Sequence, residues 1–358
     1  MKYIRTYETE EKFLTDKDST SRGFRLKPTL YKYDSNGDHI HLEIDDPREH
    51  EGSTYMEITL DSDVEFSFYI GNAPGDTQTI RDCKVDWGDG TVETKTITAD
   101  DKGFKLAHSY VAGSYKIELY MIGDYSIIGD DTNNKSLISH PSSVKRVVFG
   151  SGVVSIGVMG FTDCSSLTSV YIPESVTSIG VMGFAGCISL TSVHISEGVT
   201  SIGVMGFAGC SSLTSILIPN SVTSIGTSAF CYCPLLTSIN IPESVNSIET
   251  YAFYCCSSLT SIDIPEGITN IGEGVFESCS SLTSINIPKG VTSIGNYAFS
   301  GCSSLISISS FNTTSPILPV SVFDGLPTNG TLHVKPGATG YDAWLSLLPS
   351  GWTIVEDL

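Results

Sequence analysis

Positive charge is scarce in this 358-residue sequence, where 20 Lys and Arg side chains face 40 Asp and Glu side chains. The formal net charge of −20 argues against nucleic-acid binding and against docking on an anionic membrane, because both need clustered basic residues. No apolar run approaches the roughly 18 residues that a membrane-spanning helix needs. The 34 glycines follow no Gly-X-Y period, which excludes a collagen.

Sequence motifs of catalysis are missing as well. The chain contains no nucleophile elbow, no phosphate-binding loop and no HExxH zinc motif. Four carboxylates recur at one position of a repeat described below, and we expect them to lie along a surface rather than to face one another across a cleft: Glu174, Glu197, Glu243 and Glu266. We therefore expect no enzymatic activity, no cofactor and no catalytic or metal-binding residues.

The few basic residues are unevenly distributed along the chain. Residues 1–135 carry 27 acidic and 16 basic side chains, whereas residues 136–358 carry 13 acidic and only four basic ones. The second part is rich in Ser and Thr, so hydroxyl groups rather than ion pairs keep its surface hydrated. Two parts with such different surface chemistry indicate two modules.

A 23-residue repeat dominates the second part. Phe, Cys and Leu each recur at this step over seven cycles, beginning at Phe161, Cys164 and Leu167 and ending at Phe299, Cys302 and Leu305. A degenerate copy precedes them, with apolar residues at Val144, Val147, Phe149, Val153 and Ile156. Periods of 20 to 50 residues are typical of solenoid proteins, whose units bury their apolar face only by stacking on neighbours.

Each repeat predicts one coil of such a solenoid. Val170 and Ile172 alternate on a short strand, and Pro173 ends it because proline cannot donate a ladder hydrogen bond. Val176 and Ile179 then turn inward along an extended return. The fold class is accordingly mainly β, a parallel solenoid of about eight 23-residue coils.

The repeat F-x-x-C-x-x-L-x-x-(V/I)-x-I-P-x-x-V-x-x-I-G resembles the leucine-rich repeats of the BspA-like family over about residues 144–310. The resemblance implies a right-handed solenoid with a role in adhesion or protein recognition and without catalysis. The tail at 331–358 resembles the strand–helix–strand caps of such arrays. We expect four apolar side chains to cover the last open coil: Tyr341, Trp344, Leu345 and Leu348.

The ten cysteines divide into a ladder and three others. Equivalent atoms of stacked coils lie about 4.8 Å apart, which suits neither disulfide geometry nor convergence on a metal ion. The seven ladder cysteines are therefore predicted to be free, buried thiols. Cys231 and Cys255 lie off the ladder on adjacent coils, and pairing of these two stays open.

A second module precedes the repeats. The segment CKVDWGDGTVETKTI at 83–97 predicts a hairpin, and FKLAHSYVAGSYKIELYMIG at 104–123 predicts a strand, a tight turn at Ala112–Gly113 and another strand. Together they resemble a PKD-like immunoglobulin-type sandwich. Asp86 and Asp89 suggest calcium binding, but turn chemistry, in which Asp bonds its own backbone, is the preferred interpretation.

The N-terminal segment is less informative. Residues 28–44 predict a hairpin around Ser35-Asn36-Gly37, with His39, His41 and Glu43 on one face, interpreted as an exposed polar face rather than a metal site. The expected domains are an N-terminal hairpin or extension at 1–53, a sandwich at 54–130, the solenoid at 136–310 and the cap at 311–358.

Three functions agree with these modules. The first is an extracellular or cell-surface adhesin that binds a protein or glycan. The second is a virion or injection-particle attachment protein, which agrees with a start that lacks the apolar segment of a secretory signal. The third is a structural stalk. Partners are expected to be a protein or glycan on a host or particle surface, or a sister chain, without nucleic acid and without insertion into a membrane.

The candidate binding residues lie in the early coils. The outward strand position two before the proline slot is apolar or aromatic there and polar further on, and the segment after the glycine contains methionine. Exposed apolar patches of this kind mark interfaces, although packing against the sandwich is an alternative. The predicted contact residues are Val148, Tyr171, His194, Leu217, Met159, Met182 and Met205.

Overall fold

The computed structural model describes residues 4–7, 28–33, 39–42, 53–72, 81–97, 104–121, 125–128, 138–150 and 152–358. The chain divides into two compact units, Met1–Glu51 and Gly52–Leu358. In the first unit, β1 (Ile4–Tyr7), β2 (Pro28–Tyr33) and β3 (His39–Leu42) form an antiparallel sheet. The strands of the predicted hairpin are thus present, while its turn, Glu43 and the side chains of His39 and His41 lie outside the described residues.

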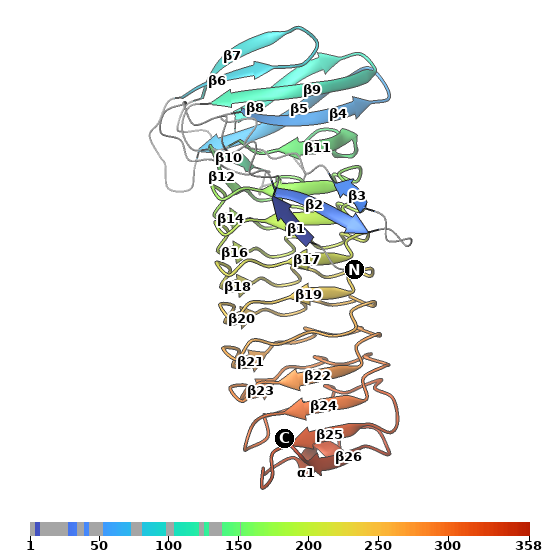
Figure 1. Ribbon diagram of the computed structural model, residues 1–358. Helices are drawn as coiled ribbons and strands as arrows, with labels where there is room; N and C mark the ends of the chain where they lie inside the picture. The colour runs from blue at the N-terminus through green and yellow to red at the C-terminus, as the bar shows by residue number, and fades with distance from the viewer. Residues whose placement is uncertain are drawn as a thin grey trace. The chain divides into compact units, whose positions relative to one another are not determined.

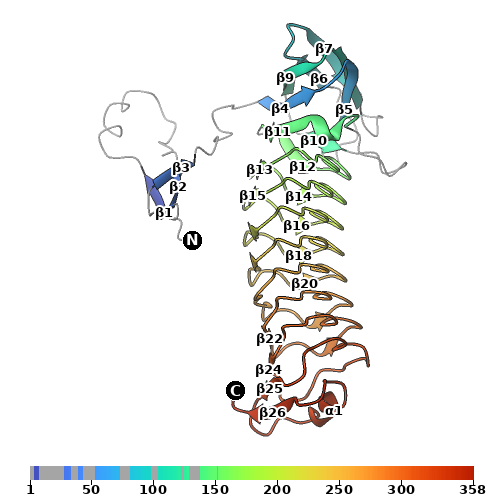
Figure 2. The same cartoon turned by 90° about the vertical axis from the view of Figure 1, so that its right-hand side faces the viewer.

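The second unit contains a mainly β solenoid of about nine turns, one more than the sequence predicts. Figures 1 and 2 show its coils stacked from β11 toward the C-terminus. One column of strands is formed by β11 (Val144–Val148), β13 (Ser169–Ile172), β15 (Ser192–Ile195), β17 (Ser215–Leu217), β19 (Ser238–Asn240), β22 (Ser284–Ile287) and β24 (Ser307–Ser310). The other is formed by β12 (Val153–Ile156), β14 (Ser178–Ile179), β16 (Ser201–Ile202), β18 (Ser224–Ile225), β20 (Ser247–Ile248), β21 (Asn270–Ile271) and β23 (Ser293–Ile294).

The repeat period sets the register of these columns. Parallel partners are separated by 23 residues, as in Val170 with Val193 and Ile179 with Ile202. Equivalent side chains therefore stack on one another, and the apolar positions of all coils fill one core between the two columns. The degenerate first coil contributes to it as predicted, because Val144, Val153 and Ile156 are fully buried.

A column of phenylalanine rings runs through this core. From Phe161 to Phe299, successive rings lie 5.4 to 5.8 Å apart and within 12° of parallel. At the two ends the stack meets tilted rings, Phe149 against Phe161 at 69° and Trp344 against Phe323 at 54°. Edge-on or tilted aromatic contacts therefore cover the terminal rings of the column at both ends.

The ladder cysteines are free and buried, and they make a contact that the sequence did not predict. Six of the seven thiols donate to the backbone carbonyl of a phenylalanine 26 residues earlier, such as Cys187 Sγ to Phe161 O at 3.2 Å. Burial raises the pKa of these thiols, to about 12 for Cys187 and Cys302. Cys231 and Cys255 are also free in the structure.

A two-layer β module occupies the other end of this unit. Its strands are β4 (Ser53–Leu60), β5 (Val64–Asn72), β6 (Arg81–Asp86), β7 (Val92–Ile97), β8 (Phe104–Tyr110), β9 (Gly113–Met121) and β10 (Tyr125–Ile128). The predicted β6–β7 hairpin is present. The strands β8 and β9 also form, but they belong to different sheets: β8 pairs with β5, and β9 with β4 and β6.

Both sheets of this module continue into the solenoid. The strand β4 pairs antiparallel with β11, and β10 pairs antiparallel with β5 and parallel with β12. The result is a seven-stranded sheet, β15-β13-β11-β4-β9-β6-β7, and an eight-stranded sheet, β20-β18-β16-β14-β12-β10-β5-β8. The module therefore caps the first coil with backbone hydrogen bonds, and the hydrophobic core runs without a break from Met56 to Trp352.

The C-terminal tail forms a strand, a helix and a strand. β25 (Thr331–Val334) and β26 (Thr353–Glu356) extend the β22–β24 sheet in parallel, with α1 (Asp342–Leu345) between them. Tyr341, Trp344 and Leu348 are buried as expected. The prediction for Leu345 is wrong: its side chain is exposed, because a helix of four residues turns only part of its surface toward the last coil.

Candidate functional site

The outer face of the seven-stranded sheet carries a continuous row of large side chains. His194, Tyr171 and Val148 lie on neighbouring strands in direct register. The row continues into the preceding module, since Val148 lies opposite Tyr55 of β4. The rings of Tyr171 and His194 stack 4.6 Å apart at an angle of 9°, which fixes both on the rigid sheet.

The row is exposed only at its solenoid end. Leu217 on β17 is 63% exposed, His194 is exposed and Tyr171 is half-buried. Val148 lies outside the hydrophobic core but is only 7% exposed, which corrects the expectation that it is accessible to a partner. Val148 is buried because β11 pairs with β4, and this neighbouring strand shields the residue from solvent.

Tyr55 continues the row, and the sequence analysis did not find it. Lys116 Nζ lies 4.2 Å from the centre of its ring, and the ring is almost fully buried. A cation over the face of an aromatic ring is attracted by the ring quadrupole. The residue precedes the repeats and shares no spacing with them, so periodicity could not have pointed to it.

The predicted methionines form a different surface. They follow the strands of the eight-stranded sheet, and the shared core separates them from the tyrosine row. Met159 is buried, which makes it unable to contact a partner, whereas Met182 is partly exposed and Met205 is exposed. Met182 packs on a small cluster of its own, formed by Ala185, Ala208 and Cys231. The seven predicted residues therefore do not make one patch.

The carboxylates after the strand join successive coils. Glu197 Oε2 accepts the backbone N–H of Ser221, and Glu243 Oε2 accepts that of Glu266, each at 3.0 Å. These side chains are exposed and lie along one edge, as the sequence predicts. Their hydrogen bonds assign a structural role to the two glutamates, since each satisfies a turn N–H of the next coil.

The Asp residues of the β6–β7 turn also bond the backbone. Asp86 Oδ1 accepts the N–H of Gly88, and Asp89 Oδ1 accepts that of Thr91, both at 2.9 Å. Asp89 Oδ2 lies 2.7 Å from His108 Nε2, and this hydrogen bond lowers the pKa of the carboxyl group. Within the described residues, no three His, Cys, Asp or Glu side chains converge as metal ligands. Nor does any described helix have the length and apolar character to cross a membrane.

The repeat geometry agrees with a family match. The BspA type leucine-rich repeat region matches residues 134–240 and 224–326 with six copies, which together span more than half of the 358 residues. The chain belongs to the BspA-type leucine-rich repeat family. No curated protein is significantly similar to this BspA-type chain.

Three solved structures of bacterial proteins resemble this BspA-type chain. A leucine-rich repeat protein from T. pallidum is 29% identical, with a TM-score of 0.42, over 51% of this chain and 83% of that one. A leucine-rich cell surface protein from Faecalibacterium prausnitzii is 23% identical, with a TM-score of 0.30, over 64% and 86%. The pneumococcal vaccine antigen PcpA is 14% identical, with a TM-score of 0.37, over 67% and 86%.

Proposed function

We propose that this BspA-type chain is a non-enzymatic recognition protein of a bacterial cell surface, and that its solenoid binds a partner protein. The observation that supports the proposal is the exposed part of the row, formed by Tyr171 and His194 on the seven-stranded sheet and by Leu217 on β17 of the next coil. We call these three residues the contact row. The membership in a repeat family that buries its core by stacking, and not around an active-site cleft, agrees with it.

The contact row has the chemistry of a protein interface. Tyrosine is enriched at the energetically dominant positions of interfaces, because its ring buries a large area with few rotatable bonds. Stacking on His194 holds the ring of Tyr171 in place before binding, which reduces the entropy lost on association. Leu217 adds an exposed apolar side chain on the same face.

The charge of the solenoid indicates the character of the partner. Residues 147–334 contain ten acidic side chains and a single basic one, Lys289. On the contact-row face itself, Asp263 occupies the equivalent position two coils beyond Leu217 and is exposed. A partner surface that combines apolar and basic side chains fits this arrangement, because complementary charge accelerates association and disfavours acidic competitors.

The proposal is tested by binding of the full chain to an array of purified extracellular protein domains, with sedimentation velocity as a parallel measure of self-association. The double variant Tyr171→Ser with Leu217→Ser is expected to weaken binding at least tenfold while its melting temperature stays nearly unchanged. The matched control is Asn240→Ala with Asn286→Ala, at later positions of the same face. Binding that the control abolishes and the first variant leaves intact would contradict the role of the contact row, whereas the absence of binding to every domain would favour a structural stalk.

A further inference from the structure

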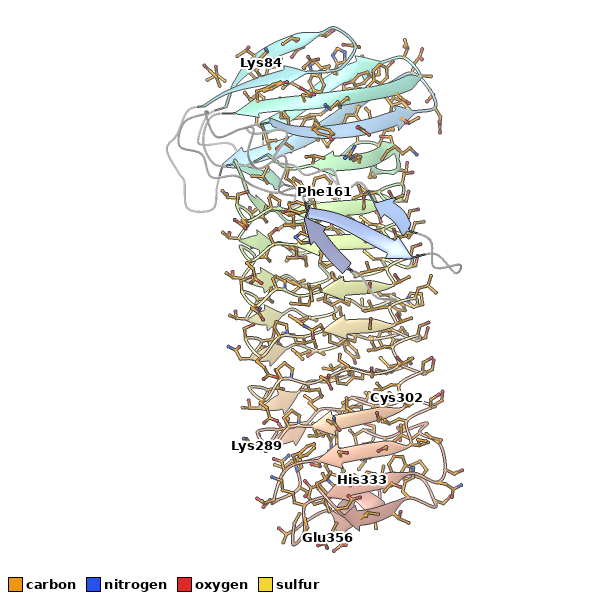
Figure 3. The ribbon with its side chains drawn as sticks, in the orientation of Figure 1. Lys84, Phe161, Lys289, Cys302, His333 and Glu356 are labelled. Atoms are coloured by element: carbon orange, nitrogen blue, oxygen red, sulfur yellow. The ribbon has the colours of Figure 1, made fainter. Side chains whose placement is uncertain are left out.

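A cavity of about 550 Å³ lies where the last repeats meet the cap. Its lining comes from the turn after β22, the segment that follows β24 and the residue after β25. Seven of the lining residues have polar side chains: Lys289, Thr292, Asn312, Thr313, Thr314, Ser315 and Lys335. Figure 3 labels Lys289 at this edge of the solenoid. The volume is within the range of sites that bind small molecules.

The cavity collects the scarce positive charge of the chain. After Arg146 the sequence contains only two basic residues, Lys289 and Lys335, against 13 acidic ones. Both of these lysines line the same cavity, although 46 positions separate them in the sequence. None of the lining residues is acidic, so the lining itself carries positive charge in a protein with a formal net charge of −20.

The position of Lys289 in the repeat strengthens this observation. The residue after the proline slot is glutamate in four earlier coils, and two of these glutamates bond the next turn. Lys289 reverses the sign at that position. Its nearest carboxylate, Glu266 Oε2, lies 4.0 Å away, and the Lys289 side chain is 73% exposed. A pair this long and exposed contributes little to stability, so the ammonium group stays available to a ligand.

The walls of the cavity are held in place by the cap. Thr339 donates its N–H to Thr313 O at 3.0 Å and accepts the N–H of Ser315 at 2.9 Å. On the other side, Ile317 N–H bonds Thr292 O at 3.0 Å. Gly340, at φ +87°, brings the cap so close that an added Cβ would lie 2.5 Å from Ser315 Oγ. The hydroxyl-bearing wall is therefore positioned before any ligand arrives.

We infer that this cavity binds a carboxylated sugar, either free or as the end of a glycan. The two ammonium groups would face the carboxylate, and the Thr and Ser hydroxyls, which donate and accept hydrogen bonds, would pair with sugar hydroxyls that do the same. The half-buried Phe311 supplies an apolar side chain for the C–H face of the ring. An acidic peptide offers carboxylates but few hydroxyls, so it uses the lysines alone. The inference does not depend on the contact row.

Saturation-transfer NMR and calorimetric titration of the full chain with glucuronate and N-acetylneuraminate at low salt test the proposal. Lys289→Gln and Lys335→Gln are each expected to weaken binding roughly fivefold, the upper range for one exposed ion pair. Glu266→Gln, which removes the competing carboxylate, is expected to strengthen binding roughly twofold. Lys145→Gln makes the same charge change outside the cavity and should leave binding unchanged.

Four results would overturn the inference. These are the absence of binding of both acids at 10-fold molar excess and millimolar protein, equal binding of neutral glucose, equal losses in Lys145→Gln and Lys289→Gln, or tighter binding of a pentaglutamate peptide than of the sugars. The last result would assign the two lysines to an acidic peptide partner. None of these results bears on Tyr171 or Leu217, so the proposed function is tested separately.

Discussion

Truncation of one ring in the phenylalanine column tests how the solenoid is stabilised. Phe230 is fully buried, and its ring stacks on Phe207 at 5.6 Å and on Phe253 at 5.7 Å. Phe230→Ala removes the ring from a coil whose backbone is hydrogen-bonded to the coils on both sides, so these coils cannot collapse into the space. A cavity then remains in the middle of the column.

The magnitude follows from the contacts that are lost. Replacing a buried phenylalanine by alanine costs about 3–5 kcal/mol, made up of the lost burial and the cavity. Each aromatic pair contributes about 0.5–1.5 kcal/mol beyond its buried area, and two pairs disappear here. We therefore expect a decrease of about 4–5 kcal/mol in the free energy of unfolding. Phe230→Leu, which keeps most of the volume, should cost about 1.5 kcal/mol.

Urea unfolding followed by far-ultraviolet circular dichroism measures these changes. Tyr232→Ala is the matched control, because Tyr232 belongs to the same coil but is 55% exposed. This substitution should lower the free energy of unfolding by less than about 1 kcal/mol. Because each coil contacts only its neighbours, Phe230→Ala should also broaden the transition as the two halves of the array uncouple. Equal midpoints for Phe230→Ala and Tyr232→Ala would refute the reasoning.

Two further predictions concern close packing and buried thiols. Gly198→Ala should destabilise the fold by about 1–3 kcal/mol, because the added Cβ would lie 2.0 Å from the carbonyl oxygen of Glu174. The control Gly267→Ala would place its Cβ 3.8 Å from the nearest atom and should change stability by less than about 1 kcal/mol. Thermal melts of both variants measure the difference. Burial raises the pKa of Cys187 and Cys302 to about 12, so the thiols stabilise the fold fully below about pH 8.5 and lose this contribution as the pH rises toward 12. Iodoacetamide at pH 8.5 should therefore label them only after unfolding, and rapid labelling of the native protein would contradict their burial.

The solenoid could be predicted from the sequence because its register is the repeat period itself. Once Phe161, Cys164 and Leu167 recur every 23 residues, the stacking of equivalent positions and the inward direction of the apolar residues follow. Several strands of the first column are short because a proline follows them, such as Pro173 after β13 and Pro288 after β22. The same regularity explains why the buried thiols were correctly placed.

The junctions could not be predicted, because no period links their two sides. The pairing of β4 with β11 joins residues about 90 positions apart and covers Val148, which the repeat pattern leaves open. At the C-terminal end the spacing between paired residues is one residue longer than the repeat, since Ser310 pairs with Val334. Lys335 follows Val334 directly and lines the same cavity as Thr313. A search for the rare basic residues alone would have singled out Lys289 and Lys335, but not their convergence.

The uniform register has a consequence for how genes of this kind change. The segments 178–187 and 201–210 are identical, both reading SIGVMGFAGC, so their coding sequences invite unequal recombination. A duplication or deletion of 23 codons between them would insert or remove one complete coil. The coils brought together by this change would make the same contacts across their interface as neighbouring coils make now. The distance between the two ends would change by about 4.8 Å per coil, while the end modules stay the same. Related proteins can therefore differ in solenoid length by whole coils, each of which folds like its neighbours.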